Sequence, residues 1–226
     1  ITATSLDVTN SAGTVVLDQS NALTNVEIDN TGRDVALANS VAMIISTGGI
    51  QGDSVVLNTV GLTQTGVITA TSLDVTNSAG NVVLDQSNAL TNVEIDNTGR
   101  DVSLTNSAAM NISAGGIQGD SVILNTAGLT QTGAITATSL DVTNSAGSVA
   151  LTSTGNTLTN VEIDNTGNSV SLTNTSLTDI SSGGIQGSLV TLNTVGLTQT
   201  GTIDASAKLT VTNTQGDVTL TQLNKL

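Results

Sequence analysis

Glutamate and aspartate stand two residues apart at three places along this chain, in the pairs Glu27 and Asp29, Glu94 and Asp96, and Glu162 and Asp164. In a β-strand, residues at this spacing project from the same face, so each pair would lie side by side. Paired carboxylates can supply the acid and the base that cleave a glycosidic bond.

Other features of the sequence argue against such a glycosidase. The chain has no aromatic residue to stack on a sugar ring and no histidine, and its only arginines are Arg33 and Arg100. The carboxylate pair also occurs in three equivalent copies, whereas an active site needs to be built only once. We therefore expect a non-enzymatic protein with no catalytic residue, in which these acidic side chains solvate one face of a strand.

The same carboxylates are also candidate ligands for Ca²⁺, which takes six to eight oxygen ligands from several chain segments. Four aspartates recur 67 residues later: Asp7, Asp18, Asp29 and Asp34 correspond to Asp74, Asp85, Asp96 and Asp101. Equivalent copies would lie too far apart to share one ion, and the glycine-rich nonapeptide of calcium-binding β-rolls is absent. The sequence therefore predicts no metal site, no cofactor and no cofactor-binding residue.

The composition narrows the possible partners. Four Lys and Arg residues against 18 Asp and Glu give a net charge of −14, which repels nucleic acid and anionic lipid. No apolar run approaches the length of a membrane span, and no leader pattern stands at Ile1, so neither nucleic acid nor membrane insertion is expected. The absence of cysteine is common in large exported bacterial surface proteins, and it weakly favours export.

A 67-residue unit organises the whole chain. Its copies span residues 1–67, 68–134 and 135–202, with a partial copy at 203–226. The first two copies differ at only nine positions: 14/81, 36/103, 38/105, 41/108, 44/111, 47/114, 56/123, 60/127 and 67/134. Duplication this faithful is typical of modules that provide length. Because the chain begins inside the repeat pattern, we expect it to be one segment of a longer protein.

Within each unit the hydrophobic period is two, as in residues 5–10 and 25–30, and glycines such as Gly13 and Gly32 separate the short runs. This pattern predicts short strands joined by turns and no helix. The spacings Val8 to Ile28, Ile50 to Ile68, Val55 to Leu73 and Leu57 to Val75 predict coils of roughly 18 to 22 residues, with three to four coils in each unit.

The predicted fold is therefore all-β, a right-handed parallel β-helix in a single segment, 1–226, of about 10 to 12 coils and roughly 50 Å in length. The register of residues 38–55, which contain the Gly48 to Gly52 insertion, stays open. We expect six apolar side chains to be buried, Val8, Val75, Val142, Ile28, Ile95 and Ile163, and three glutamates to be exposed, Glu27, Glu94 and Glu162.

Asparagines follow several strands in phase with the inward apolar residues, namely Asn10, Asn30, Asn77, Asn97, Asn144, Asn165 and Asn213. Stacked amides can bond to one another and to turn backbone, which satisfies polar groups that a coil would otherwise bury. The alternative is ordinary Asx-turn chemistry at the strand ends.

Residues 62–77 read L-x-Q-x-G-x-I-x-A-x-x-L-x-V-x-N, and the pattern recurs from Leu129 and, with one inserted residue, from Leu197. This pattern resembles the haemagglutinin-type repeat of filamentous haemagglutinin-like exoproteins, which are secreted by bacterial two-partner systems. The resemblance covers roughly a third of each unit. It implies an elongated right-handed β-helix, exported to the cell surface, that serves as an adhesin shaft or as a stalk. The long 67-residue period and the lack of the family's secretion domain depart from that pattern.

From these features we expect a structural rod of a large exported surface protein, extracellular or at the cell surface. The alternative is a self-assembling subunit of an extracellular filament, sheath or surface layer. The expected partners are neighbouring repeats, copies of the same protein, or the surface of a host or neighbouring cell.

Overall fold

The computed structural model describes residues 1–226 and contains strands but no helix, which confirms the all-β prediction. The strands form where Val, Ile, Leu and Thr alternate with polar residues. The 19 strands are β1 Thr2–Thr9, β2 Val15–Asp29, β3 Val35–Asn39, β4 Met43–Gln51, β5 Ser54–Thr59, β6 Leu62–Gln64, β7 Ile68–Asn77, β8 Val82–Asp96, β9 Val102–Asn106, β10 Met110–Gln118, β11 Ser121–Thr126, β12 Leu129–Gln131, β13 Ile135–Asn144, β14 Val149–Leu151, β15 Thr157–Asp164, β16 Val170–Thr173, β17 Thr178–Thr194, β18 Leu197–Gln199 and β19 Ile203–Asn213.

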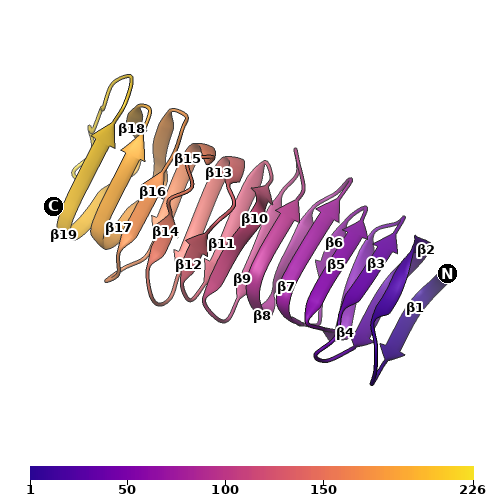
Figure 1. The fold of residues 1–226 in the computed structure, drawn as a ribbon. Helices are drawn as coiled ribbons and strands as arrows, with labels where there is room; N and C mark the ends of the chain where they lie inside the picture. The colour runs from indigo at the N-terminus through magenta and orange to yellow at the C-terminus, as the bar shows by residue number, and fades with distance from the viewer.

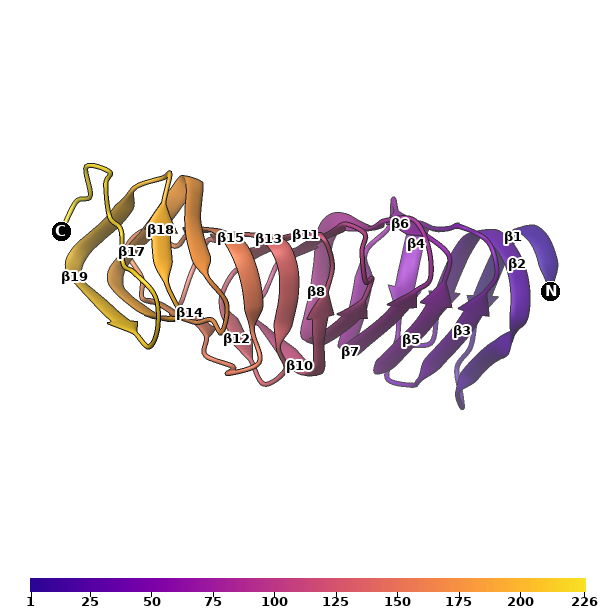
Figure 2. The same cartoon turned by 90° about the horizontal axis from the view of Figure 1, so that it is seen from above.

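These strands wind into a parallel β-solenoid of about 11 coils, with the two chain ends at opposite ends of a rod (Figures 1 and 2). Each strand between β1 and β19 pairs in parallel with a strand one coil before it and, except at the ends of the rod, with a strand one coil after it. All four predicted spacings are confirmed as pairs of adjacent coils: Val8 with Ile28, Ile50 with Ile68, Val55 with Leu73, and Leu57 with Val75.

One 67-residue unit does not fill a whole number of coils. Starting from Leu6, the pairing passes through Val26 and Ile45 to Gln64, which completes three coils. Leu73, the equivalent of Leu6, lies nine residues farther along the next coil and pairs instead with Val55. Equivalent residues of successive units therefore occupy different sides of the rod and do not stack on one another.

The interior is one continuous cluster of 47 buried aliphatic residues that runs the length of the rod. Burial is confirmed for five of the six residues expected inside, since Ile28, Val75, Ile95, Val142 and Ile163 are fully enclosed. The prediction was wrong for Val8, which is only half-buried. Val8 belongs to β1, which pairs only with β2, so no coil covers its other side.

A bulge in β4 settles the register of residues 38–55. Val26 pairs with Ile45 and Ile28 with Ile50, so β4 carries three more residues than β2 between these two pairs. The extra length contains Gly48 and Gly49, and Gly49 has a φ of 77°. The same shift recurs between β8 and β10 and between β15 and β17. Only glycine adopts such a backbone at little cost, so the Gly-Gly pair allows each coil to absorb the insertion.

The expected exposure of the three glutamates was also wrong, because Glu27, Glu94 and Glu162 are half-buried. They do point outward, since their neighbours along the strand are buried. Each glutamate side chain lies over the first glycine of the bulge on the next coil, and a methyl group on Gly48 would come 2.5 Å from an Oε atom of Glu27. Because glycine has no side chain, there is room for the glutamate side chain above it.

Buried amides organise the corners of the coils. The predicted stacking is confirmed in three two-membered pairs, with donor-to-acceptor distances of 2.8 Å for Asn10 to Asn30, 2.7 Å for Asn77 to Asn97 and 2.7 Å for Asn144 to Asn165. The second asparagine of each pair also donates to a turn carbonyl, as Asn30 does to that of Asp34. Asn213 donates to its own turn at Gly216. The amides thus combine stacking with turn capping.

A second kind of amide pair was not predicted from the sequence. The side chains of Gln64 and Asn88 exchange two hydrogen bonds of 2.9 Å, and the Asn88 carbonyl oxygen also accepts from the backbone N–H of Ile68. The arrangement recurs at Gln131 with Asn156 and at Gln199 with Asn224. These reciprocal pairs satisfy amides inside an otherwise aliphatic interior.

Candidate functional site

The carboxylates meet across coils as well as along a strand. Asp74 pairs in register with Glu94, and Asp141 with Glu162, as Asp7 does with Glu27. The spacing along the strand predicts a different pair, Glu94 with Asp96. The cross-coil pair follows from the spacing that joins Val8 to Ile28, because Asp7 and Glu27 precede those two residues directly.

Aliphatic neighbours change the chemistry of two of these carboxyls. Val56 pairs with Asp74 on the outer surface of the preceding coil, and Ile123 pairs with Asp141 in the same way. Burial raises the pKa of Asp74 above its ordinary 3.8, and the negative charge of Glu94 raises it further. The pKa of Asp141 rises for the same two reasons, with Glu162 as the neighbouring charge. Each site thus pairs a carboxyl of raised pKa with a second carboxylate.

The other acidic residues form turn and surface contacts. Asp29 accepts a hydrogen bond of 2.8 Å from the Thr31 hydroxyl, which also lies 3.1 Å from Gln51, and the two later copies repeat this contact. Asp18 and Asp85 accept from the glutamine that follows each of them, while Asp101 accepts from Asn81. No group of three or more metal-ligating acidic side chains gathers at one place.

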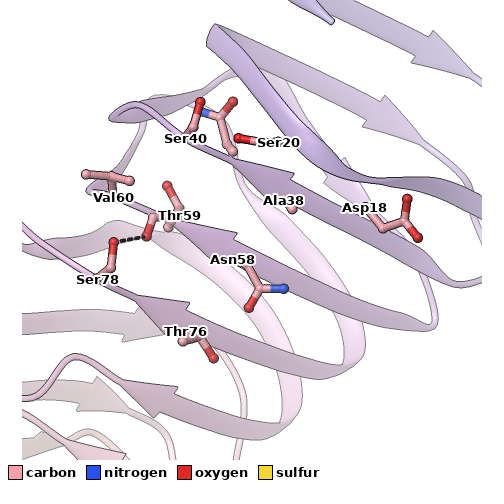
Figure 3. Close-up of a pocket in the computed structure, with 10 residues that line it drawn as sticks. Asp18, Ser20, Ala38, Ser40, Asn58, Thr59, Val60, Thr76 and Ser78 are labelled. Atoms are coloured by element: carbon pink, nitrogen blue, oxygen red, sulfur yellow. Dashed lines mark hydrogen bonds between the residues drawn. The ribbon is translucent and has the colours of Figure 1, made fainter.

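A polar groove of about 330 Å³ lies along one edge of the first coils (Figure 3). Its rim carries Ser20, Ser40 and Ser78, and Thr59 lies on the coil between the last two serines. The Ser78 hydroxyl donates to the Thr59 carbonyl at 3.2 Å. Asp18 is the only ionisable residue that lines it. A serine hydroxyl needs an adjacent base to act as a nucleophile, so these groups are suited to hydrogen bonding with a polar surface.

A second groove of about 700 Å³ lies at another corner of the same coils and is lined by uncharged residues. Its aliphatic members include Ala42, Ile44, Val60 and Val83. The second unit has a counterpart of about 390 Å³ around Asn111 and Ala127. Neither groove was predicted from the sequence. Each is built from turns of different coils, which come together because one unit does not fill a whole number of coils.

The raised pKa of Asp74 predicts that Asp74→Asn stabilises the protein at neutral pH. The folded state binds this proton more tightly than the unfolded chain does, so ionisation of Asp74 costs stability once the pH exceeds its folded pKa. Below the ordinary value of 3.8 both states are protonated and the penalty vanishes. We expect the melting temperature to rise by a few degrees at most at pH 7.

Calorimetry of the wild type and of Asp74→Asn between neutral pH and about pH 3 measures this difference. Asp85→Asn is the matched control, since it removes one negative charge from an exposed strand position. A melting temperature that rises equally in both variants would assign the effect to net charge and contradict a local origin at Asp74.

No helix long and apolar enough to cross a membrane occurs in the structure. Comparison of the chain with protein-family models, with characterised proteins and with solved structures finds no significant match.

Proposed function

We propose that this chain is a non-enzymatic shaft segment of a large exported bacterial surface protein, where it acts as an adhesin stalk. The observation that carries the proposal is the uninterrupted stack of about 11 parallel coils around a single aliphatic core. In such a stack every coil pairs with its neighbours, so added units increase length without requiring a new core.

The distribution of differences between copies supports this role. None of the nine positions that distinguish the first two units is buried in either copy. The core, the amide pairs and the glycine bulges are therefore held constant while the surface varies. Selection for a uniform shaft has this signature, since each interior position must match the coils above and below it.

The resemblance of residues 62–77 to the filamentous haemagglutinin-type repeat supports export and a place at the cell surface. The family's role as a shaft agrees with the elongated shape of the solenoid (Figure 1). In this proposal no residue performs catalysis, and the distal parts of the protein contact the host or neighbouring cell.

A subunit of an extracellular filament, sheath or surface layer is the second candidate function. It is favoured by the uncharged aliphatic groove, a feature that a passive shaft does not require.

Imaging of tandem arrays tests the shaft. Chains with one, two and three added 67-residue units should appear as rods of constant width, each unit adding roughly 16 Å at a coil spacing of about 4.8 Å. Globular particles, or rods that thicken with unit number, would contradict the proposal.

Antibody labelling tests the location. An antibody raised against residues 1–226 should label intact, unpermeabilised cells that express the full protein, and protease treatment of those cells should remove the label. Labelling that appears only after permeabilisation would contradict a surface location.

A further inference from the structure

The uncharged groove between β4, β6 and β8, named here the aliphatic groove, contrasts with the rest of a chain whose net charge is −14. Ala42, Ile44, Val60 and Val83 supply its apolar surface, and Gly61 lies among them. A methyl group at Gly61 would lie 3.4 Å from the Cβ of Ala42, so the glycine keeps this part of the groove open. The groove is suited to an aliphatic side chain.

The third unit shows which side chain this corner accepts. Leu177 stands where the first unit has Ala42 and the second has Ala109. A methyl group at Gly196, the equivalent of Gly61, would lie 2.9 Å from the Cδ1 of Leu177. A leucine thus packs against the glycine in the third unit, where the first unit leaves an open groove. Leu177 nevertheless remains 57% exposed, so most of its surface is unpartnered.

Leu177 and the aliphatic groove lie on the same side of the rod. Met43 directly follows Ala42, and Ile180 lies three residues after Leu177. A series of residues paired from coil to coil, a ladder, connects Met43 to Ile180. The ladder is Met43, Leu62, Val82, Val102, Val122, Leu140, Val161 and Ile180. With a coil spacing of about 4.8 Å, the level of Leu62 in the groove and that of Ile180 are roughly 29 Å apart.

We propose that two copies of this chain associate side by side and antiparallel, each inserting Leu177 into the aliphatic groove of the other. A twofold axis perpendicular to the rod places the groove of each copy at the height of Leu177 of the other copy. Both Leu177 contacts therefore form at once. The axis passes near the level of Val122, halfway along the ladder.

Charged residues of both signs lie near this axis. Arg100 precedes Val102 on the same side of the rod, and its guanidinium donates only to the carbonyl of Gly99, at 2.9 Å. The one salt bridge in the chain joins Lys225 to Asp204, so Arg100 has no carboxylate partner. Asp120 lies on the next coil, where its N–H donates to the Arg100 carbonyl at 2.7 Å. The twofold arrangement places the Asp120 carboxylates of the two copies at the same level, and Arg100 of each copy lies one coil, about 4.8 Å, from that level.

The contact should be weak and dependent on salt. The contact surface between the two copies is a strip about seven coils long and one strand wide. Its total buried area is below about 1,200 Å², which is at the low end for specific protein–protein interfaces. Each copy also carries a charge of −14, and this repulsion is screened as ionic strength rises. We expect reversible dimers at high protein concentration, favoured by added sodium chloride.

Sedimentation equilibrium of the 226-residue chain measures the association constant. Leu177→Ala, which installs the residue of the other two units, should lower that constant at least tenfold. Ala42→Leu, which installs the residue of the third unit, should fill the groove and lower it similarly. Leu189→Ala is the matched control, because Leu189 is 46% exposed but pairs with Lys208 on another side of the rod. Its association constant should match that of the wild type.

Disulfide trapping tests the geometry, since the chain has no cysteine of its own. A mixture of Leu177→Cys and Ala42→Cys copies should form a mixed disulfide, whereas Leu189→Cys mixed with Ala42→Cys should not. A wild type that stays monomeric up to millimolar concentration in high salt, or equal association constants for Leu177→Ala and Leu189→Ala, would overturn the proposal. These measurements report association, so they are independent of the imaging that tests the shaft.

Discussion

Ile95→Asp is expected to unfold the second unit while the first and third units keep their protection from hydrogen exchange. Ile95 is 1% exposed and stacks between Val75 and Ile117 on the neighbouring coils. A carboxylate there would enter an aliphatic interior that contains no Lys, Arg or His, which costs several kcal/mol unless the group takes up a proton. In a quasi-one-dimensional stack, this damage falls first on the substituted coil and its neighbours.

The matched control is Glu94→Gln on the same strand. Glu94 points outward and lies beside the Asp74 carboxylate, so neutralising it should change stability by less than about 0.5 kcal/mol. Hydrogen exchange followed by mass spectrometry separates the two variants unit by unit. If Glu94→Gln proved the more damaging, that carboxylate would need a binding role and the purely structural interpretation of this face would be wrong.

Gly133→Ala is expected to cost about 3 kcal/mol or more, although the φ of Gly133 is an ordinary one. A methyl group on Gly133 would collide with the carbonyl oxygen of Ser113 and lie 2.6 Å from the nitrogen of Gly116. Both atoms belong to the backbone of the β10 bulge on the preceding coil. Neither segment can retreat easily, because the N–H groups of residues 132 and 133 both donate to the Ile112 carbonyl, at 2.8 and 3.2 Å.

Gly99→Ala provides the comparison, measured by denaturant unfolding of both variants. Gly99 has a φ of +72° and no atom within 4 Å of an added methyl group, so only the backbone conformation is penalised, at about 1–2 kcal/mol. A Gly133→Ala variant no less stable than Gly99→Ala would show that the bulge yields, and that the tight stacking of glycine on the bulge does not hold the coils in register.

The sequence was sufficient for the features that depend on local alternation. Period-two patterning placed Ile28, Val75 and Ile95 inside, because a strand sends successive side chains to opposite faces. Recurrence at coil spacing then identified Val55 and Leu73 as stacked neighbours. The predicted burial and stacking are correct because the inward-facing residues stay apolar from one coil to the next.

The period-two pattern did not predict the bulge in β4 or the half-burial of the glutamates. Three extra residues in β4 change the register by an amount that periodicity between Val26 and Ile50 does not reveal. The half-burial of Glu27 depends on the empty space above Gly48, which belongs to the next coil. Alternation specifies the face on which a side chain lies, whereas its exposure also depends on residues one coil away.

By itself, then, the sequence determined the strand-and-turn rhythm, the aliphatic interior, the stacked asparagines and the approximate coil length. The tertiary structure alone decided which residues line the aliphatic groove, and that Leu177 lies on the side of that groove. The physical reason is the winding. A 67-residue unit spans more than three and fewer than four coils, so its copies turn around the rod, and small differences in coil length determine which side each one faces.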